Sequence, residues 1–377
     1  MNKKPNLAFF TSAQSGLAHY TTHLFGPSKK YFKPYYVTYS DSLIDDLVER
    51  HIGRVESIIK KEDPASVLLT LKFLKDNKIN FINFNVATTA RKSYFHFVAL
   101  LSKAQLMGVK VIATMHDVMP FESFYIDPAA LELLYSCVDH YVVGNESEKN
   151  KLQLYFQVPK EKITIIEHGP YVLFDEKKYD KVSARKHLNI PQNKKVILFF
   201  GNLRPHKGLK YLIKSFNKVL KQVPDAWLYI SSDLKYSPQL NDLLQRVEKS
   251  GVGNKIQIIK KYVPSYEIEP IFKAADVVVM PYTMVSQSGI LNLAYAFKKP
   301  SVVTDIFPDA SAIDRKFGRV AKAEDAESLT ECLVDLLEEN PKVLSVMGKA
   351  GYEYAMKQAS WDKAAESLYD ITKKLSR

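Results

Sequence analysis

Short runs of β-branched and aromatic residues alternate with amphipathic helical stretches along almost the whole chain. Such alternation is typical of parallel sheets with helices on both faces. The series begins near Asn6 and starts again near Lys195. The pattern therefore predicts an α/β fold made of two Rossmann-like, doubly wound domains in series.

The alternation gives a set of expected strands and helices. In the first half the expected strands are Asn6–Thr11, Tyr35–Tyr39, Phe81–Asn83, Lys110–Met115, His140–Gly144 and Ile163–Ile166. Helical periodicity covers Asp45–Lys61 and Arg91–Met107. In the second half the expected strands are Lys195–Phe200, Trp227–Ser231, Ile256–Ile259, Val277–Pro281 and Ser301–Thr304, with helices from Gly208, near Pro238–Ser250 and from Gly289.

A length of 377 residues suits two domains better than one core. The polar, lysine-rich segment from Glu176 to Lys195 is broken by Pro191 and is the expected join. We place the domains at residues 1–180 and 181–360. The last segment, Trp361–Leu375, reads as an amphipathic helix that begins after Ser360.

Several classes of protein are disfavoured by composition. No stretch approaches the ~20 consecutive apolar residues of a membrane-spanning helix, and Leu7–Phe10 is too short for a signal-peptide core. Cys137 and Cys332 lie far apart and form no disulfide or metal-binding pattern. We therefore expect a cytoplasmic protein without a bound metal.

The basic excess is concentrated in the second half. Residues 181–377 hold 31 Lys and Arg against 21 Asp and Glu, while the first 180 residues are nearly balanced. Such a surplus suits nucleic acid, anionic lipid or a phosphorylated small ligand. Because no zinc-finger, bZIP or RNP-like pattern is present, nucleic acid is not an expected partner.

The strongest local signal is the segment Phe199–Gly208, which reads as strand, basic turn and helix start. Ligands in open α/β sheets lie beyond the carboxyl ends of the strands. Gly201 allows close backbone approach next to Asn202, and a following helix offers free N–H groups to an anion. Arg204 and Lys207 add two cations, so the segment suits a pyrophosphate. The alternative is a solvated basic turn.

The second signal follows the strand Val277–Pro281. Ser286, Gln287 and Ser288 supply neutral hydrogen-bonding groups of the kind that ribose and sugar hydroxyls require, and Gly289 opens the next helix. The alternative is a turn that ends in an ordinary N-cap serine.

The first half offers weaker candidates. Thr11–Tyr20 follows the first strand, with Gly16 as a loop glycine and His19 on the helix that follows. His116 and Asp117 follow another strand, where a histidine could donate to a sugar hydroxyl or steady the charge of a leaving group. The alternative is an imidazole satisfied by Asp117. His168 closes the last strand of this half, either as a cleft residue or in a turn.

The helix start at Arg91–Phe97 combines charges and aromatic residues. It could contact a lipid surface or a phosphorylated acceptor. The alternative is a helix that packs its aromatic side chains and exposes its charges.

Taken together, these segments resemble glycosyltransferases of family 4, which have the GT-B architecture. Phe199–Gly208 looks like the family's strand–turn–helix, and Ala274–Pro281 looks like its "ADV…P" strand. Trp361-Asp362 is similar to the pair that opens the C-terminal helix, while Gly16 and His116 stand where the family has a first-strand glycine loop and a histidine near the donor sugar.

The resemblance implies two domains facing across a cleft, with helix 361–377 crossing back to complete the first. The first domain would take the acceptor and the second the nucleotide-sugar donor. Arg204 and Lys207 would hold the donor diphosphate, His116 would orient the sugar, and His19, Asp117 and His168 would lie on the acceptor side. Transfer with retention, without a metal or other cofactor, is the implied reaction.

The chain departs from the family's usual motif at the paired glutamates, whose places hold Val285 and Leu293. It follows instead a sub-group that reads Ser-Gln-Ser-Gly, at Ser286–Gly289. Asn202 stands at the usual arginine, for which Arg204 substitutes, and Lys298 replaces a glycine.

The leading hypothesis is a transferase that moves a sugar from a nucleotide-diphosphate-sugar to a glycan or lipid-linked acceptor in cell-surface polysaccharide synthesis. Peripheral contact with the inner face of the membrane fits such an acceptor. The missing glutamates leave open a non-catalytic nucleotide-sugar-binding relative or partner subunit of a transferase. A GT-B sugar-nucleotide epimerase is the third reading.

Overall fold

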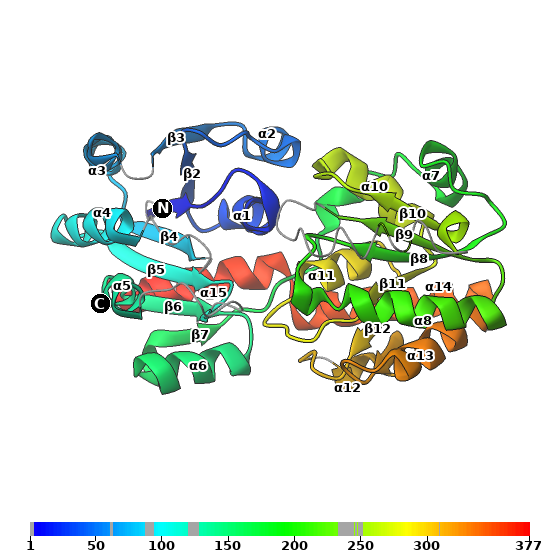
Figure 1. Ribbon diagram of the computed structural model, residues 1–377. Helices are drawn as coiled ribbons and strands as arrows, with labels where there is room; N and C mark the ends of the chain where they lie inside the picture. Colours follow the sequence, from blue (N-terminus) through cyan, green and yellow to red (C-terminus); the bar gives the residue numbers. More distant parts are fainter. Residues whose placement is uncertain are drawn as a thin grey trace. The chain divides into compact units, whose positions relative to one another are not determined.

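The computed structural model describes residues 4–60, 63–86, 94–119, 128–232, 252–308 and 310–377, together with residues 245 and 247. The chain divides into two compact units (Figure 1). Unit 1 consists of residues 1–169 and 359–377, and unit 2 of residues 170–358. The domain boundaries expected from the sequence, at residues 180 and 360, stay predictions.

Unit 1 is built on a parallel sheet with the strand order β3-β2-β1-β4-β5-β6-β7. The strands are β1 (Asn6–Phe10), β2 (Lys33–Tyr39), β3 (Val55–Ile59), β4 (Phe81–Val86), β5 (Lys110–Met115), β6 (His140–Val143) and β7 (Ile163–Ile165). The helices are α1 (Ser15–Ser28), α2 (Asp46–Ile52), α3 (Pro64–Asp76), α4 (Tyr94–Leu106), α5 (Pro128–Ser136), α6 (Glu146–Phe156) and α15 (Trp361–Leu375), with the 3₁₀ turn η3 (Lys160–Lys162).

Helices cover both faces of this sheet because successive side chains of a strand point to opposite sides. Ala8 and Phe10 join a buried cluster with residues of α3, α4 and α5. Phe9, between them, points the other way and packs on Phe25 of α1, with ring centroids 5.9 Å apart.

Unit 2 repeats the arrangement with the parallel strand order β10-β9-β8-β11-β12-β13. The strands are β8 (Lys195–Phe200), β9 (Ala226–Ser231), β10 (Ile256–Ile259), β11 (Val277–Met280), β12 (Ser301–Thr304) and β13 (Gly318–Ala321). Its helices are α7 (Lys181–His187), α8 (Leu209–Gln222), α10 (Ser265–Ala274), α11 (Gly289–Ala296), α12 (Ala310–Ile313), α13 (Ala326–Glu338) and α14 (Pro341–Gln358), with the turns η4 (Val172–Phe174), η5 (Pro205–Lys207) and η7 (Gly253–Lys255).

Here too both faces of the sheet are covered. Phe199 belongs to a buried cluster with Leu212 and Phe216 of α8. Its neighbour Phe200 packs on Phe272 of α10, with ring centroids 5.2 Å apart. The expected fold class, α/β with two Rossmann-like parallel sheets, is therefore confirmed.

One expected element is wrong. The helix expected over Asp45–Lys61 ends at Ile52, and Val55–Ile59 forms β3, paired with β2. Gly53 has a φ of 80° and turns the chain out of the helix. The β-branched residues that follow it favour a strand. The helix expected near Pro238–Ser250 and the residues Arg91–Ser93 lie outside the described part of the chain, apart from residues 245 and 247.

The segment expected to be a linker is part of unit 2. It contains α7, and Arg185 in this helix is only 2 % exposed. Its guanidinium donates to the carbonyl oxygens of Ala274 and Gln192 and to the carboxylate of Asp276, at 3.0, 2.7 and 2.7 Å. The lysine-rich segment therefore contains a packed helix of unit 2, while the boundary expected near residue 180 stays a prediction.

The C-terminal helix α15 is part of unit 1. It starts at Trp361, after the N-cap Ser360, whose hydroxyl accepts from the Lys363 amide at 3.2 Å. Trp361 packs edge-on to Tyr20 of α1, with ring centroids 5.3 Å apart. Further along, Tyr369 stacks on Tyr31 at 5.1 Å. The expected return of this helix to the first domain agrees with these contacts.

Candidate functional site

The topology of unit 2 selects two loops for ligand binding. In a doubly wound sheet, ligands bind beyond the carboxyl ends of the strands where the strand order reverses direction. In unit 2 this switch point lies between β8 and β11, which are neighbours in the sheet. The loops that follow these two strands, residues 201–208 and 281–288, are the two segments singled out from the sequence.

The two loops contact each other directly. The amide of Thr283 donates to the carbonyl oxygen of His206 at 2.8 Å. A Cβ atom added to Gly208 would lie 1.7 Å from the carbonyl oxygen of Pro281, and Gly208 has a φ of 70°. Only glycine fits this position, so Gly208 is required for the loops to pack together.

Gly201 also needs to be a glycine. Its φ is 112°, and its amide donates to the carbonyl oxygen of Ser231 at 3.0 Å. Asn202, which follows it, is exposed, and Arg204 is partly buried. The first loop therefore leaves the sheet through a fixed backbone turn and presents polar side chains at its rim.

Lys207 ends the turn η5, and α8 begins two residues later, at Leu209. Its ammonium Nζ lies 3.8 Å from the centroid of the Tyr282 ring in the second loop. Among the described residues it makes no ion pair, so its charge is not cancelled by a carboxylate. Burial, followed by the charges of Lys207 and Arg204, lowers the pKa of His206 to about 4. This histidine is neutral at pH 7.

In the second loop, Ser288 caps α11: its hydroxyl accepts from the amide of Leu291 at 3.3 Å. Ser288 is thus the N-cap serine of the alternative reading. Ser286 is 6 % exposed. A Cβ atom on Gly289 would lie 3.2 Å from the Tyr171 ring, so this position is crowded as well.

Gln287 is the unusual residue of this loop. Its side-chain Oε1 and Nε2 are both buried, and neither has a hydrogen-bond partner among the described residues. Buried polar groups normally have partners, because an unpaired one costs roughly 1–3 kcal/mol. An amide with both ends unsatisfied in a switch-point loop has the hydrogen-bonding groups that the hydroxyls of a ligand require.

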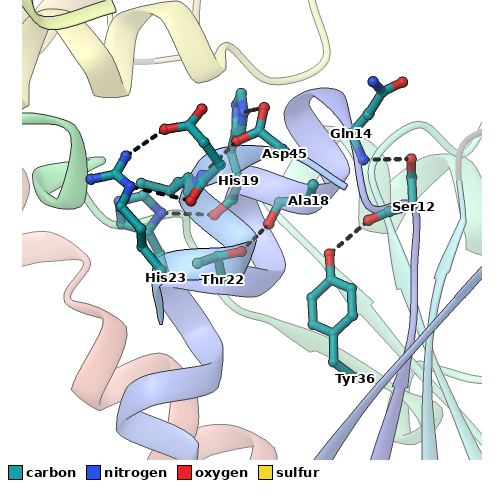
Figure 2. A network of polar contacts seen from close by, with 11 residues as sticks. Ser12, Gln14, Ala18, His19, Thr22, His23, Tyr36 and Asp45 are labelled. Carbon is teal, nitrogen blue, oxygen red and sulfur yellow. Dashed lines mark hydrogen bonds and ion pairs between the residues drawn. The ribbon is translucent and has the colours of Figure 1, made fainter. Parts of the chain in front are cut away.

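The first loop of unit 1 is held by Tyr36 of β2 and by a contact of its own, between Gln14 and Ser12 (Figure 2). Tyr36 donates to the carbonyl oxygen of Ser12 at 2.7 Å, and the Gln14 amide donates to the Ser12 hydroxyl at 3.1 Å. Ser15, with a φ of 70°, makes the turn into α1. A Cβ atom on Gly16 would meet nothing within 4 Å, so the packing does not require a glycine there.

His19 lies one turn into α1. Its Nε2 is 3.5 Å from the carboxylate of Asp45, which caps α2 by accepting from the Leu47 amide at 2.9 Å (Figure 2). His19 is therefore tied to the start of α2. Asp117 follows β5 and is partly buried.

His116 and His168 lie together in unit 1, with ring centroids 5.6 Å apart. His116 Nε2 is 3.0 Å from the Oδ1 of Asn85 at the end of β4. Both rings pack on Tyr20, which is 1 % exposed. Burial lowers the pKa of His116 to about 4, and burial together with His116 lowers the pKa of His168 well below its usual value. Both imidazoles are neutral at pH 7.

Three residues in these sites were not found from the sequence: Tyr282, His206 and Asn85. Tyr282 directly follows Pro281, the last residue of an expected strand, and His206 lies between Arg204 and Lys207. Their positions in the two loops were the sequence signal that could have identified them. No sequence signal pointed to Asn85, because the strand was expected to end at Asn83. In the structure β4 continues to Val86.

The described part of the chain contains no helix long and apolar enough to cross a membrane. Within the same residues there is no cluster of three or more His, Cys, Asp or Glu side chains placed to hold a metal ion.

The fold is that of the GT-B glycosyltransferases. The chain is similar in fold to sucrose-phosphate synthase from Thermosynechococcus elongatus, with a TM-score of 0.76 and 15 % identity. The similarity covers 99 % of each chain. It is also similar to Anabaena HepE in complex with UDP-glucose, with a TM-score of 0.75 and 14 % identity over 98 % of this chain and 99 % of HepE.

The sequence is similar to that of known glycosyltransferases over part of its length. Residues 180–354 match the family described as "Glycosyl transferases group 1". The chain is 28 % identical over 242 residues to the D-inositol 3-phosphate glycosyltransferase of Corynebacterium aurimucosum, covering 62 % of this chain and 56 % of that protein. It is 24 % identical over 230 residues to the lipopolysaccharide core biosynthesis mannosyltransferase LpsB of Rhizobium meliloti, covering 59 % and 63 %. The chain spans about half the length of the first curated relatives it matches.

Proposed function

We propose that the protein is a glycosyltransferase that moves a sugar from a nucleotide-diphosphate-sugar to a glycan or lipid-linked acceptor in cell-surface polysaccharide synthesis. The proposal includes retention of the anomeric configuration, a reaction without metal or other cofactor, and membership of family 4 in the sub-group with a Ser-Gln-Ser-Gly loop. The match of unit 2 to the glycosyl transferases group 1 family and the LpsB relative support it.

The observation that carries the proposal is the contact between the two switch-point loops. The two loops in contact, called the loop pair below, contain both Lys207 and Gln287. The charge of Lys207 is not cancelled by a carboxylate, and the side-chain amide of Gln287 has no hydrogen-bond partner among the described residues. A cation suits the diphosphate of a donor, and an amide suits hydroxyls of its ribose or sugar. A nucleotide-diphosphate-sugar carries both kinds of group.

In this proposal Arg204 and Lys207 stabilise the negative charge that develops on the departing diphosphate. These two positive charges are in place before the reaction and lie close to the leaving group. We assign most of the rate enhancement to this electrostatic stabilisation. The donor is also contacted by backbone and side-chain groups of the two loops, from Gly201, Asn202, Ser286, Ser288 and Gly289. His116, neutral and hydrogen-bonded to Asn85, orients the sugar.

The acceptor belongs to unit 1 in this proposal, with His19, Asp117 and His168 nearby. We also propose a cytoplasmic location with contact to the inner face of the membrane, where lipid-linked acceptors are found. Two free cysteines fit a reducing compartment.

The test is a panel of UDP-, GDP- and ADP-sugars, first in binding by calorimetry and then in turnover with lipid-linked and free glycan acceptors. Tight binding of one donor, with sugar transfer that needs an acceptor, is the expected result. Epimerisation without acceptor would make the protein an epimerase, and binding without any turnover would make it a non-catalytic relative. Failure of every nucleotide to bind would overturn the proposal.

A further inference from the structure

The contact between the Lys207 ammonium and the Tyr282 ring joins two loops whose backbones are fixed by other contacts. Lys207 precedes Gly208, whose close approach to the Pro281 carbonyl fixes the end of the first loop. The second loop is fixed in turn by the Thr283 amide, which donates to His206. The backbone on both sides of the contact is therefore set before any ligand arrives.

The Tyr282 ring is equally constrained. The residue is 1 % exposed, and its ring packs on Phe307 with centroids 5.3 Å apart and an interplanar angle of 38°. The hydroxyl of Thr304, at the end of β12, donates to the Tyr282 carbonyl oxygen at 2.8 Å. A ring packed in this way presents one face to the lysine.

An aromatic face attracts an ammonium group through its quadrupole and carries no net charge. It therefore holds a lysine in place without neutralising it. A carboxylate in the same position would hold Lys207 too, but it would compete with an incoming anion. A π face suits a lysine whose charge is needed for a ligand, because only the conformational freedom of the side chain is removed.

We propose that Tyr282 is a positioning residue that holds the Lys207 ammonium ready for the diphosphate of the donor. The inference rests on the proposed function, because it assigns a role to Lys207 there. It goes beyond that function in explaining why a large aromatic residue follows Pro281 at the end of β11.

The test is a double-mutant cycle on Lys207→Ala and Tyr282→Leu. The measurement is calorimetric affinity for the best-bound of UDP, GDP and ADP. Tyr282→Leu is expected to weaken binding roughly three- to tenfold in the wild-type background, in line with the strength of a cation–π contact. In the Lys207→Ala background it is expected to have no further effect. Equal losses in both backgrounds would mean that Tyr282 acts only through packing and would overturn the inference.

Two further variants keep the ring while changing one property at a time. Tyr282→Phe removes only the hydroxyl and is expected to bind the nucleotide as the wild type does. Replacing that phenylalanine with 3,4,5-trifluorophenylalanine keeps the shape but weakens the π face, and it is expected to reproduce the loss seen with Tyr282→Leu. These variants decide the question even where Tyr282→Leu does not fold.

The outcomes separate the inference from the proposed function. If wild-type protein binds none of the three nucleotides, both are wrong. If Lys207→Ala binds as tightly as the wild type, the role of Lys207 and the inference are wrong. If Lys207→Ala loses affinity while the fluorinated variant does not, the proposed function survives and the inference alone is overturned.

Discussion

Lys207 and Lys210 lie three residues apart and each ammonium sits over a tyrosine ring, but their surroundings differ. Lys207 lies in the loop pair, over the buried Tyr282, at 3.8 Å from the ring centroid. Lys210 is exposed on α8, over Tyr211 at 4.7 Å. Lys207→Ala is expected to weaken nucleotide binding by roughly 10- to 150-fold, since a charge-assisted contact contributes roughly 1.5–3 kcal/mol.

Lys210→Ala is the matched control, because it removes the same charge from a neighbouring position. It is expected to change affinity and turnover by less than about twofold, as for an exposed charge. Similar losses in the two variants would show that overall positive charge, and not the loop pair, attracts the nucleotide.

Gln287 allows a prediction in which stability and binding move in opposite directions. Gln287→Met keeps the shape of the side chain but removes two unsatisfied buried polar atoms. Unit 2 of the ligand-free protein is therefore expected to gain roughly 1–3 kcal/mol, or a Tm higher by at least about 2 °C. Nucleotide-sugar affinity is expected to fall at the same time. Both are measured by calorimetry.

Gln257→Met is the control for this change. The Nε2 of Gln257 donates to the carbonyl oxygen of Leu188 at 2.8 Å, while its Oε1 is buried without a partner among the described residues, so this substitution breaks one hydrogen bond and removes one unsatisfied atom. The two effects oppose each other, so the Tm is expected to rise less than with Gln287→Met, and binding is expected to stay unchanged. A lower Tm for Gln287→Met would mean that its amide has a structural role.

At the scale of elements, both units join neighbouring strands through an aspartate that precedes a strand. Asp139, before β6, accepts from the amide of Val111 in β5 at 2.8 Å. Asp276, before β11, accepts from the amide of Val196 in β8 at 2.7 Å and also pairs with the buried Arg185. The "ADV" aspartate therefore has a structural role, away from the loop pair.

The difference between these aspartates predicts a difference in stability. Asp276→Ala leaves the Arg185 guanidinium buried without its counter-ion and is expected to destabilise unit 2 by about 3–5 kcal/mol. Asp139→Ala removes a backbone partner, a hydrogen bond from Gln105 and an exposed lysine contact, and about 1 kcal/mol is expected. Hydrogen exchange read separately in the two units measures both, and equal losses would contradict the expected role of Arg185.

The sequence predicted most of the sheet and both switch-point loops, because buried parallel strands are nearly continuous apolar runs such as Val277–Met280. It did not predict β3, since a single glycine ended the helical pattern and the strand is short. It did not predict that Gln287 lacks partners or that Tyr282 faces Lys207 either. Both features depend on the close approach of the two loops. The need for a glycine at position 208 becomes clear only when the structure places the Pro281 carbonyl beside it.

At the scale of the whole molecule, buried histidines predict acid sensitivity of unit 1. Burial, aided by Lys374 and Lys162, lowers the pKa of His140 from 6.5 to about 4, and burial does the same for His116. Such a histidine takes up a proton on unfolding, so stability falls as the pH drops from about 6.5 to about 4. His140→Gln is expected to flatten this loss in unit 1.

The control is His187→Gln, which changes a histidine of α7 in unit 2. It is expected to leave the pH dependence of hydrogen exchange in unit 1 as it is. Urea unfolding between pH 7 and pH 4.5, followed by hydrogen exchange in unit 1, measures both variants. An unchanged slope for His140→Gln would place the acid sensitivity in other groups.

Unit 2 is one continuous stretch of chain, whereas unit 1 is completed only by residues 359–377. A deletion that removes α15 would therefore leave unit 2 with its whole chain but take from unit 1 the helix that packs on Tyr20 and Tyr31. Two segments far apart in the sequence must meet before unit 1 is complete, and until they do its aromatic surface beside α1 stays uncovered.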